Sequence, residues 1–178
     1  GYRIVTSGRE GRQVHGEGRG RAASDIVLPP VDLDALRGTM SGAVDPSGLY
    51  ARFEALGLGY GPAHRPVTSL ATGEARVLAR LELPAAATDD MALHPSMLDG
   101  ALQSLLVLTT GDDAALAVPY ALRRLVVLGP TEPVMWAVGE RDGATHTVRL
   151  CDETGRLLAL FEGFAARAVS PPAHVRPP

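Results

Sequence analysis

The segment 94–109 places an acid and an amide, four residues apart, inside a mostly apolar helix pattern. Its apolar residues cover nearly the whole circumference of the predicted helix: Met97, Leu98, Ala101, Leu102, Leu105, Leu106 and Leu108. A helix that is apolar all round is usually buried in a core. The pattern therefore predicts a helix over 95–109 that the rest of the fold must enclose.

This helix contains one acid and one amide, Asp99 and Gln103, which share one face because they lie four residues apart. A buried carboxylate is costly unless it is hydrogen-bonded or used in chemistry. Gln103 can supply one hydrogen bond and orient the carboxylate. Two interpretations stay open from these residues alone: a structural Asp satisfied by its neighbours, or a functional acid.

Length and charge narrow the class of protein. A chain of 178 residues allows one domain with a real core, and the low aromatic content (4%) predicts a core of Leu, Val and Ala. The net charge of −3 argues against a general nucleic-acid binder. All 17 basic residues are Arg. The pair Arg123-Arg124 could contact a carrier-protein or phosphate partner, but a solvated strand edge is the simpler interpretation of any such pair.

The single cysteine, Cys151, excludes an intrachain disulfide and a Cys metal cluster, and we expect it to be a small core residue. Trp136 is expected in the core or an interface. The sequence shows no signal peptide and no apolar run long enough to span a bilayer, so we expect a cytoplasmic protein without a membrane partner.

The first third of the chain alternates between extended and helical patterns. Two strands are predicted over 2–6 and 13–21 with a turn at 8–11, followed by an extended linker and a short helix over 33–37. Asp45-Pro46 is a typical helix start, and Gly57 ends that helix.

The remainder alternates strand, helix and strands. We predict a strand over 74–83, the helix over 95–109, then four strands over 117–128, 134–140, 145–151 and 157–169, with a Pro-rich tail. One long apolar helix wrapped by an antiparallel sheet is an α+β fold. The order of elements matches the hotdog architecture, a curved antiparallel sheet around a long central helix.

Several motifs together resemble one family. Residues 57–63 (GLGYGPA) resemble the YGPxF motif, and residues 93–103 (LHPSMLDGALQ) resemble the HPxxLDxxxQ/H motif, of dehydratase domains in modular type I polyketide synthases. Residues 118–120 and 155–164 resemble later strands of that family. The resemblance implies a double hotdog: 1–23 as final strands of an N-terminal hotdog, 24–44 as linker, 45–170 as the C-terminal hotdog and 171–178 as tail. We expect exposed apolar surface where the first hotdog would dock.

The resemblance also implies a reaction. A β-hydroxyacyl group, held as a thioester on the phosphopantetheine of an acyl carrier protein, loses water to give the α,β-unsaturated thioester. Asp99 would act on the departing hydroxyl, with supporting roles for Gln103, Tyr60 and His94. The expected pocket residues are Pro62, His64, Gly100 and Pro119. No metal or other cofactor is implied.

The implied partners are the carrier protein, neighbouring synthase domains and an upstream N-terminal hotdog, in a homodimeric parent enzyme. Loss of water also requires a base, and the family's base lies in an HxxxGxxxxP motif that this sequence lacks. The histidines of the chain match no such position: His94 precedes the helix, and His146 alternates along a strand and is expected at the surface.

Three explanations for the missing base stay open. The His could lie upstream of this chain, or the domain could be a repurposed dehydratase relative that branches, isomerises, cyclises or only binds a carrier-tethered chain. A single self-standing hotdog, such as a thioesterase, is disfavoured because it needs neither the linker nor the first two strands. A pure interaction module would be favoured if Asp99 were dispensable.

Overall fold

The computed structural model describes residues 1–8, 11–22, 26–85, 91–109 and 117–168. The strands in this part are β1 (Tyr2–Gly8), β2 (Gly11–Gly18), β3 (Gly42–Val44), β4 (Val67–Gly73), β5 (Arg76–Glu82), β6 (Ala117–Val127), β7 (Val134–Asp142), β8 (Thr145–Cys151) and β9 (Leu157–Ala168). The helices are α1 (Leu33–Thr39), α2 (Pro46–Ala55) and α3 (Pro95–Gln103), with short 3₁₀ helices η1 (Pro62–His64) and η2 (Ser104–Leu108). None of these helices is long and apolar enough to cross a membrane.

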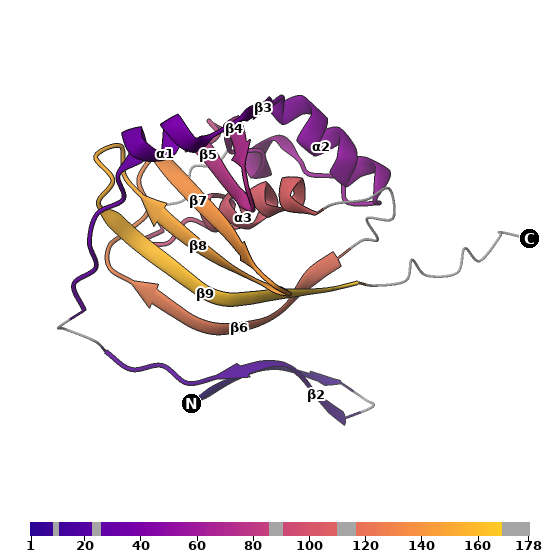
Figure 1. Ribbon diagram of the computed structural model, residues 1–178. Helices are drawn as coiled ribbons and strands as arrows, with labels where there is room; N and C mark the ends of the chain where they lie inside the picture. Colours follow the sequence, from indigo (N-terminus) through magenta and orange to yellow (C-terminus); the bar gives the residue numbers. More distant parts are fainter. Residues whose placement is uncertain (9–10, 23–25, 86–90, 110–116, 169–178) are drawn as a thin grey trace, which may run out of the picture.

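The main body is one antiparallel sheet of seven strands in the order β3-β4-β5-β7-β8-β9-β6. Figure 1 shows this sheet curving around α3, while β1 and β2 form a separate hairpin. The expected α+β hotdog, a curved antiparallel sheet around a central helix, is confirmed.

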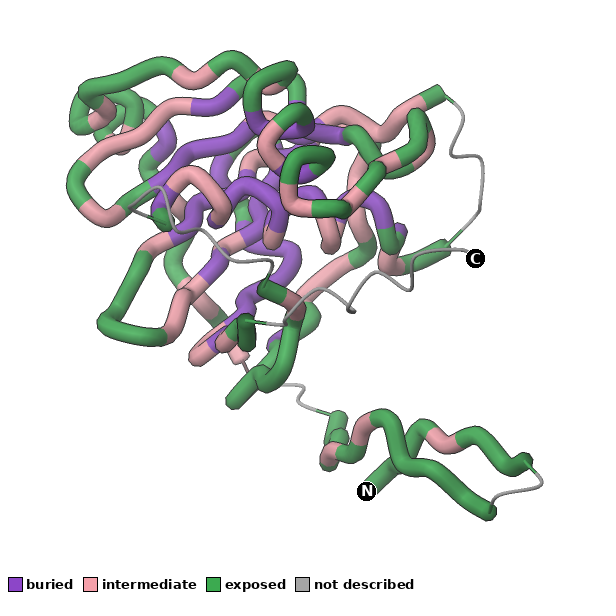
Figure 2. Tube along the Cα trace, turned by 90° about the vertical axis from the view of Figure 1, so that its right-hand side faces the viewer, coloured by how far each residue is buried: buried purple, intermediate pink, exposed green. Residues whose placement is uncertain are grey.

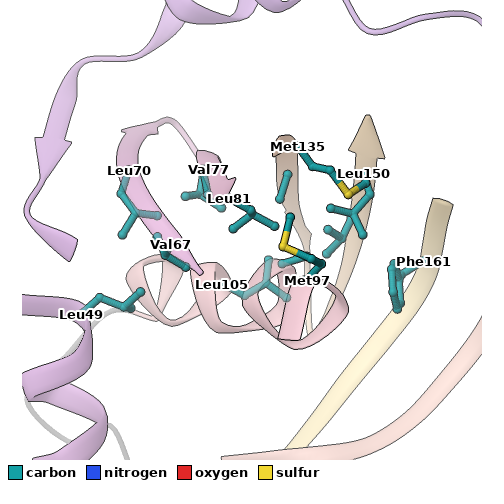
Figure 3. Close-up of a cluster of buried hydrophobic side chains, with 14 of the residues drawn as sticks. Leu49, Val67, Leu70, Val77, Leu81, Met97, Leu105, Met135, Leu150 and Phe161 are labelled. Atoms are coloured by element: carbon teal, nitrogen blue, oxygen red, sulfur yellow. The ribbon is translucent and has the colours of Figure 1, made fainter. Parts of the chain in front are cut away.

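The sheet buries apolar residues on both faces because successive side chains of a strand point to opposite sides. Val77 and Leu81 of β5 belong to the main core, together with Met97 and Leu105 from the helical segment (Figure 3). Leu78, between them in sequence, belongs to a second cluster with Leu33 of α1. Helix α1 thus covers the face of the sheet opposite to α3.

The central helix begins where the sequence predicts. His94 is its N-cap, and the Nδ1 atom of the ring accepts the backbone N–H of Ser96 at 3.2 Å. Pro95 occupies the first helical position, where a missing N–H costs nothing. The predicted helix over 95–109 is confirmed, with a change from α to 3₁₀ geometry after Gln103.

Two strands of the sheet were not predicted. Strand β3 lies inside segment 24–44, which the sequence suggested as linker, and pairs with β4. A strand of three residues is too short for its periodicity to show. Strand β4 reads VTSLATG, and only Val67 and Leu70 in it are fully buried, so its apolar pattern is weak. The predicted tail, 171–178, lies outside the described residues.

The edge strand β6 carries several exposed apolar side chains. Tyr120, Leu122, Leu125 and Val127 are all exposed, with Tyr120 at 66%. Strand β6 pairs only with β9 in the described sheet, so its other edge is open. The β1–β2 hairpin is likewise exposed along most of its length (Figure 2).

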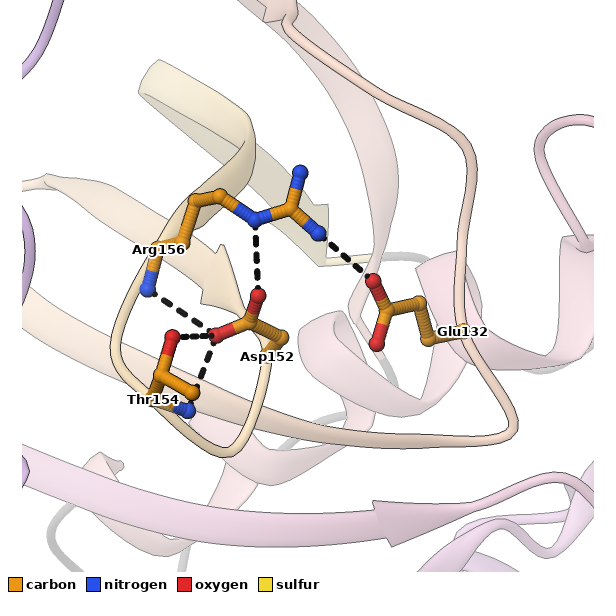
Figure 4. A network of polar contacts seen from close by, with 4 residues as sticks. All are labelled: Glu132, Asp152, Thr154 and Arg156. Carbon is orange, nitrogen blue, oxygen red and sulfur yellow. Dashed lines mark hydrogen bonds and ion pairs between the residues drawn. The ribbon is translucent and has the colours of Figure 1, made fainter.

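A buried carboxylate stabilises the turn between β8 and β9. Asp152 Oδ1 accepts the hydroxyl and N–H of Thr154 at 2.7 and 2.9 Å, and the N–H of Arg156 at 3.0 Å. Asp152 Oδ2 accepts Arg156 Nε at 2.8 Å, and Arg156 Nη2 also donates to Glu132 (Figure 4). Burial by itself raises the pKa of the Asp152 carboxyl, but the hydrogen bonds from Thr154 and Arg156 hold it below its ordinary value.

We expect Asp152→Asn to lower the free energy of unfolding by about 1–3 kcal/mol at neutral pH, because an amide cannot accept all of these bonds. The folded pKa of Asp152 lies below the unfolded one, so the carboxylate stabilises the fold above its unfolded pKa and loses this effect as pH falls through the folded pKa. Urea unfolding should give a difference in the free energy of unfolding between wild type and Asp152→Asn that is larger near pH 7 than in acid. The control is Glu153→Gln, next to it and exposed; a pH-independent difference for Asp152→Asn would contradict this assignment.

Candidate active site

The acid and the amide of α3, Asp99 and Gln103, lie against each other as their spacing predicts. Gln103 Nε2 donates to Asp99 Oδ2 at 2.8 Å. Asp99 is half-buried and Gln103 is 3% exposed. The carboxylate therefore keeps one side open, while the amide that orients it is fixed in the core.

All the hydrogen-bonding groups of the Gln103 amide have partners. Its Nε2 also donates to the His64 carbonyl at 3.1 Å, and its Oε1 accepts the Tyr50 hydroxyl at 3.2 Å. The Tyr50 oxygen in turn accepts the N–H of Val67 at 3.1 Å. A continuous path of hydrogen bonds thus runs from strand β4 through Tyr50 and Gln103 to Asp99, and it leaves only one orientation for the amide.

Tyr50 is a member of this site that the sequence analysis missed, because its spacing in α2 fits an ordinary core residue. Burial raises the pKa of Tyr50 to about 12, so the phenol keeps the proton that it donates to Gln103. A buried Tyr needs a partner for its hydroxyl, and this requirement is the one signal in the sequence that could have been used.

Asp99 lines a cavity of about 220 Å³ that lies between helix α2, the helical segment α3–η2 and strands β6, β8 and β9. Its wall is mainly apolar and is formed by Phe53, Leu58, Tyr60, Leu102, Leu105, Leu106, Thr109, Ala117, Val118, Pro119, Phe164 and Ala166, with Asp99, Gln103 and His146. A concave apolar pocket with few polar groups is the usual form of a small-molecule site.

Tyr60 lies beside the carboxylate in this cavity. Its ring meets Phe53 edge-on, with centroids 5.0 Å apart, which fixes its position. Burial, and then the negative charge of Asp99, raise the pKa of Tyr60. The phenol therefore stays protonated at neutral pH and can donate a hydrogen bond near Asp99.

Of the other residues predicted for the pocket, some line the cavity and others lie outside it. Pro119 lines the cavity, whereas Pro62 and His64 are exposed and lie outside its wall. Only the backbone of His64 serves the site, through its carbonyl. Gly100 does not make room for the carboxylate: a Cβ there would lie 2.3 Å from the Pro66 ring, so the missing side chain admits Pro66. His94 caps α3.

Two further expectations concern polar residues of the sheet. His146 was expected at the surface, but it lines the cavity, and both of its ring nitrogens are covered. The prediction failed because alternation along β8 does not show that the face in question is enclosed by the helix. Cys151 is fully buried, as predicted, and burial followed by the charge of Asp152 raises its pKa to about 12, which makes it unreactive.

The chain has the curved sheet and enclosed helix of a hotdog domain. Its cavity holds one oriented acidic side chain, as in a hotdog domain with an active-site acid. The sequence model of the family described as "Polyketide synthase dehydratase N-terminal domain" matches residues 28–174. The chain belongs to the polyketide synthase dehydratase family.

Individual relatives agree with this assignment. Polyketide synthase ThaG of Burkholderia thailandensis is 40% identical over 144 residues, which cover 79% of this chain and 2% of ThaG. A trans-AT PKS dehydratase domain from Brevibacillus brevis superposes with a TM-score of 0.87 at 30% identity, covering 94% of this chain and 64% of that one. An inactive Asp-to-Asn mutant of the CurK dehydratase superposes with a TM-score of 0.76 at 26% identity, covering 82% and 55%. The chain thus spans a small fraction of its curated relative and about 55–64% of these solved dehydratases.

We expect Tyr50→Phe to disturb both stability and the site. Removing the hydroxyl leaves the buried N–H of Val67 and Gln103 Oε1 without their partner, at a cost of about 1–3 kcal/mol in the free energy of unfolding. Turnover should fall by more than stability explains, because the orientation of Asp99 depends on Gln103. Urea unfolding together with a dehydration assay at a temperature where both proteins are folded would measure this. The matched control is Tyr120→Phe, an exposed phenol; equal effects of the two changes would contradict the proposed hydrogen-bond path.

Proposed function

We propose that this chain is the aspartate-bearing part of a dehydratase that removes water from a β-hydroxyacyl thioester during polyketide chain processing. The observation that carries the proposal is Asp99, oriented by Gln103 and open to an apolar cavity. The name of the matching family refers to an N-terminal domain, but the motif around Asp99 supports the C-terminal hotdog.

In the proposed reaction Asp99 protonates, or donates a hydrogen bond to, the departing β-hydroxyl. A base removes the α-proton, the C–H electron pair becomes the new C=C bond, the C–O bond breaks, and water leaves. Tyr60 lies beside Asp99 and can bind the same hydroxyl or the thioester carbonyl. No electrons pass to or from the substrate overall, so the reaction needs no redox cofactor.

The base in this proposal is a His from the other hotdog. The 178 residues contain no HxxxGxxxxP motif. The CurK dehydratase is known in two inactive mutants, one with Asp replaced by Asn and one with His replaced by Phe. These two substitutions support a mechanism with one carboxylate and one imidazole, of which this chain carries the carboxylate.

The proposed substrate is carried on the phosphopantetheine of an acyl carrier protein, and the apolar wall of the cavity suits an acyl chain. We further propose that the chain works with neighbouring synthase domains and an N-terminal hotdog, in a homodimeric enzyme. The exposed apolar residues of β6 are consistent with such a contact.

A second candidate function rests on the same cavity and its oriented carboxyl group. In it the same cavity binds a carrier-tethered chain, and Asp99 serves isomerisation, branching or cyclisation instead of dehydration. The discriminating experiment uses the full polypeptide that carries this chain with a β-hydroxyacyl carrier protein, followed by mass spectrometry of the carrier. Loss of one water supports the dehydratase; a bound carrier that retains its water supports the second candidate.

A further inference from the structure

His146 is a polar residue of the cavity wall that has no role in the mechanism described above. His146 lies near the start of β8, paired with Arg141 of β7 and Phe164 of β9. Its side chain faces the cavity that also holds Asp99, and its ring lies 6.4 Å from that of Phe164, another wall residue. His146 is thus a polar residue in an apolar part of the wall.

Neither ring nitrogen of His146 makes a well-aligned hydrogen bond to the described residues, although the nearby backbone of Phe164 favours the charged form, and each nitrogen is covered from solvent. An unsatisfied buried polar group is destabilising, and in a native protein it calls for an explanation. Burial, and then the positive charge of Arg141, lower the pKa of His146, so the ring is neutral at pH 7. A neutral imidazole has one N–H donor and one acceptor, and can therefore bind either a hydroxyl or a carbonyl.

His146 and Asp99 lie toward different ends of the helical wall. Arg141, the cross-strand partner of His146, donates from Nη1 to the carbonyl of Leu108 at the end of η2. Asp99 lies in α3, before η2 begins. A chain whose reacting carbons lie at Asp99 therefore meets His146 with other atoms than the reacting carbons.

We propose that His146 forms a subsite for an oxygen substituent, a hydroxyl or a keto group, on a part of the acyl chain away from the reacting carbons. The proposal rests on the proposed function, which places the β-hydroxyl at Asp99. A half-turn of the ring about Cβ–Cγ exchanges the positions of its nitrogens and carbons, so the ring can present a nitrogen where a carbon now lies when a substrate oxygen binds. The substrate oxygen then supplies the missing partner, and chains without it leave His146 unsatisfied.

The test measures kcat/KM for dehydration of matched acyl carriers by the full polypeptide. One carrier bears a plain β-hydroxyacyl chain, and the others bear one additional hydroxyl moved two carbons at a time along the chain. We expect one hydroxylated chain to be preferred about three- to tenfold, the value of one neutral hydrogen bond. His146→Phe should remove this preference, so that the ratio of kcat/KM between the hydroxylated and the plain chain falls to about one, whereas His146→Gln, which keeps a donor and an acceptor, should retain part of it.

Each outcome decides a separate question. Equal rates for all chains with the wild type, or a preference that persists in His146→Phe, would overturn the subsite while leaving the dehydratase intact. If no chain loses water, the proposed function fails, and the affinity for the acyl carriers then tests the subsite. Tighter binding of one hydroxylated chain that is lost in His146→Phe supports the subsite. Equal binding of all chains overturns the subsite. If His146→Phe does not fold, the ¹⁵N resonances of the His146 ring in the wild type replace it; a change with the preferred chain only supports the subsite, and no difference between chains overturns it.

Discussion

Asp99→Asn should abolish dehydration and leave the fold intact. General acid–base groups contribute about 10²–10⁴-fold to rate, and an amide in place of the carboxyl cannot donate the same proton. The fold should survive because Asn has the same shape and its side-chain oxygen can still accept the 2.8 Å bond from Gln103. Mass spectrometry of the acyl carrier after a timed reaction measures turnover, and thermal unfolding measures stability.

The matched control for this change is Asp142→Asn, which alters an exposed carboxylate at the end of β7. It should change neither turnover nor stability. Unchanged dehydration by Asp99→Asn would refute the assignment of Asp99, because another group would then have to protonate the departing hydroxyl. Retained binding of the acyl carrier by Asp99→Asn, without turnover, would show that the residue acts in chemistry and not in substrate binding.

The largest effect on stability is expected for Gly155→Ala, in the turn between β8 and β9. Gly155 has φ +86°, and a Cβ there would lie 2.1 Å from the carbonyl oxygen of Val31. The same glycine accepts the N–H of Val31 at 2.8 Å through its own carbonyl, so the two backbones cannot separate without losing this bond. The left-handed backbone and the steric clash together should lower the free energy of unfolding by about 2–5 kcal/mol.

Gly143→Ala separates the two causes. Gly143 also has a positive φ, +57°, in the turn between β7 and β8, but a Cβ there meets no atom within 4 Å. Gly143→Ala should lower the free energy of unfolding only by the cost of the left-handed backbone conformation, about 1–2 kcal/mol. Urea unfolding of both variants gives the comparison, and similar losses would mean that the segment around Val31 moves away freely and does not depend on this turn.

The sequence predicted most of the local structure of the central helix and its site. Asp99 and Gln103 are four residues apart, and a helix necessarily brings such residues together, so their hydrogen bond follows from local geometry. The four C-terminal strands and helix α2 carry strong periodic patterns and turn residues, and they lie close to where these patterns predict them. Strands β3 and β4 escaped prediction because their pairing depends on the rest of the sheet more than on their own composition.

Only the tertiary structure decided what surrounds Asp99. Tyr50 and His146 are far from Asp99 in sequence, and both looked like ordinary residues of an amphipathic helix or strand. The curvature of the sheet around α3 encloses the face that bears His146, and the packing of α2 brings the Tyr50 hydroxyl to Gln103. Local patterns determine the elements and the acid on its helix, whereas contacts between distant segments determine the cavity, because burial and hydrogen-bond partners arise only when those segments pack together.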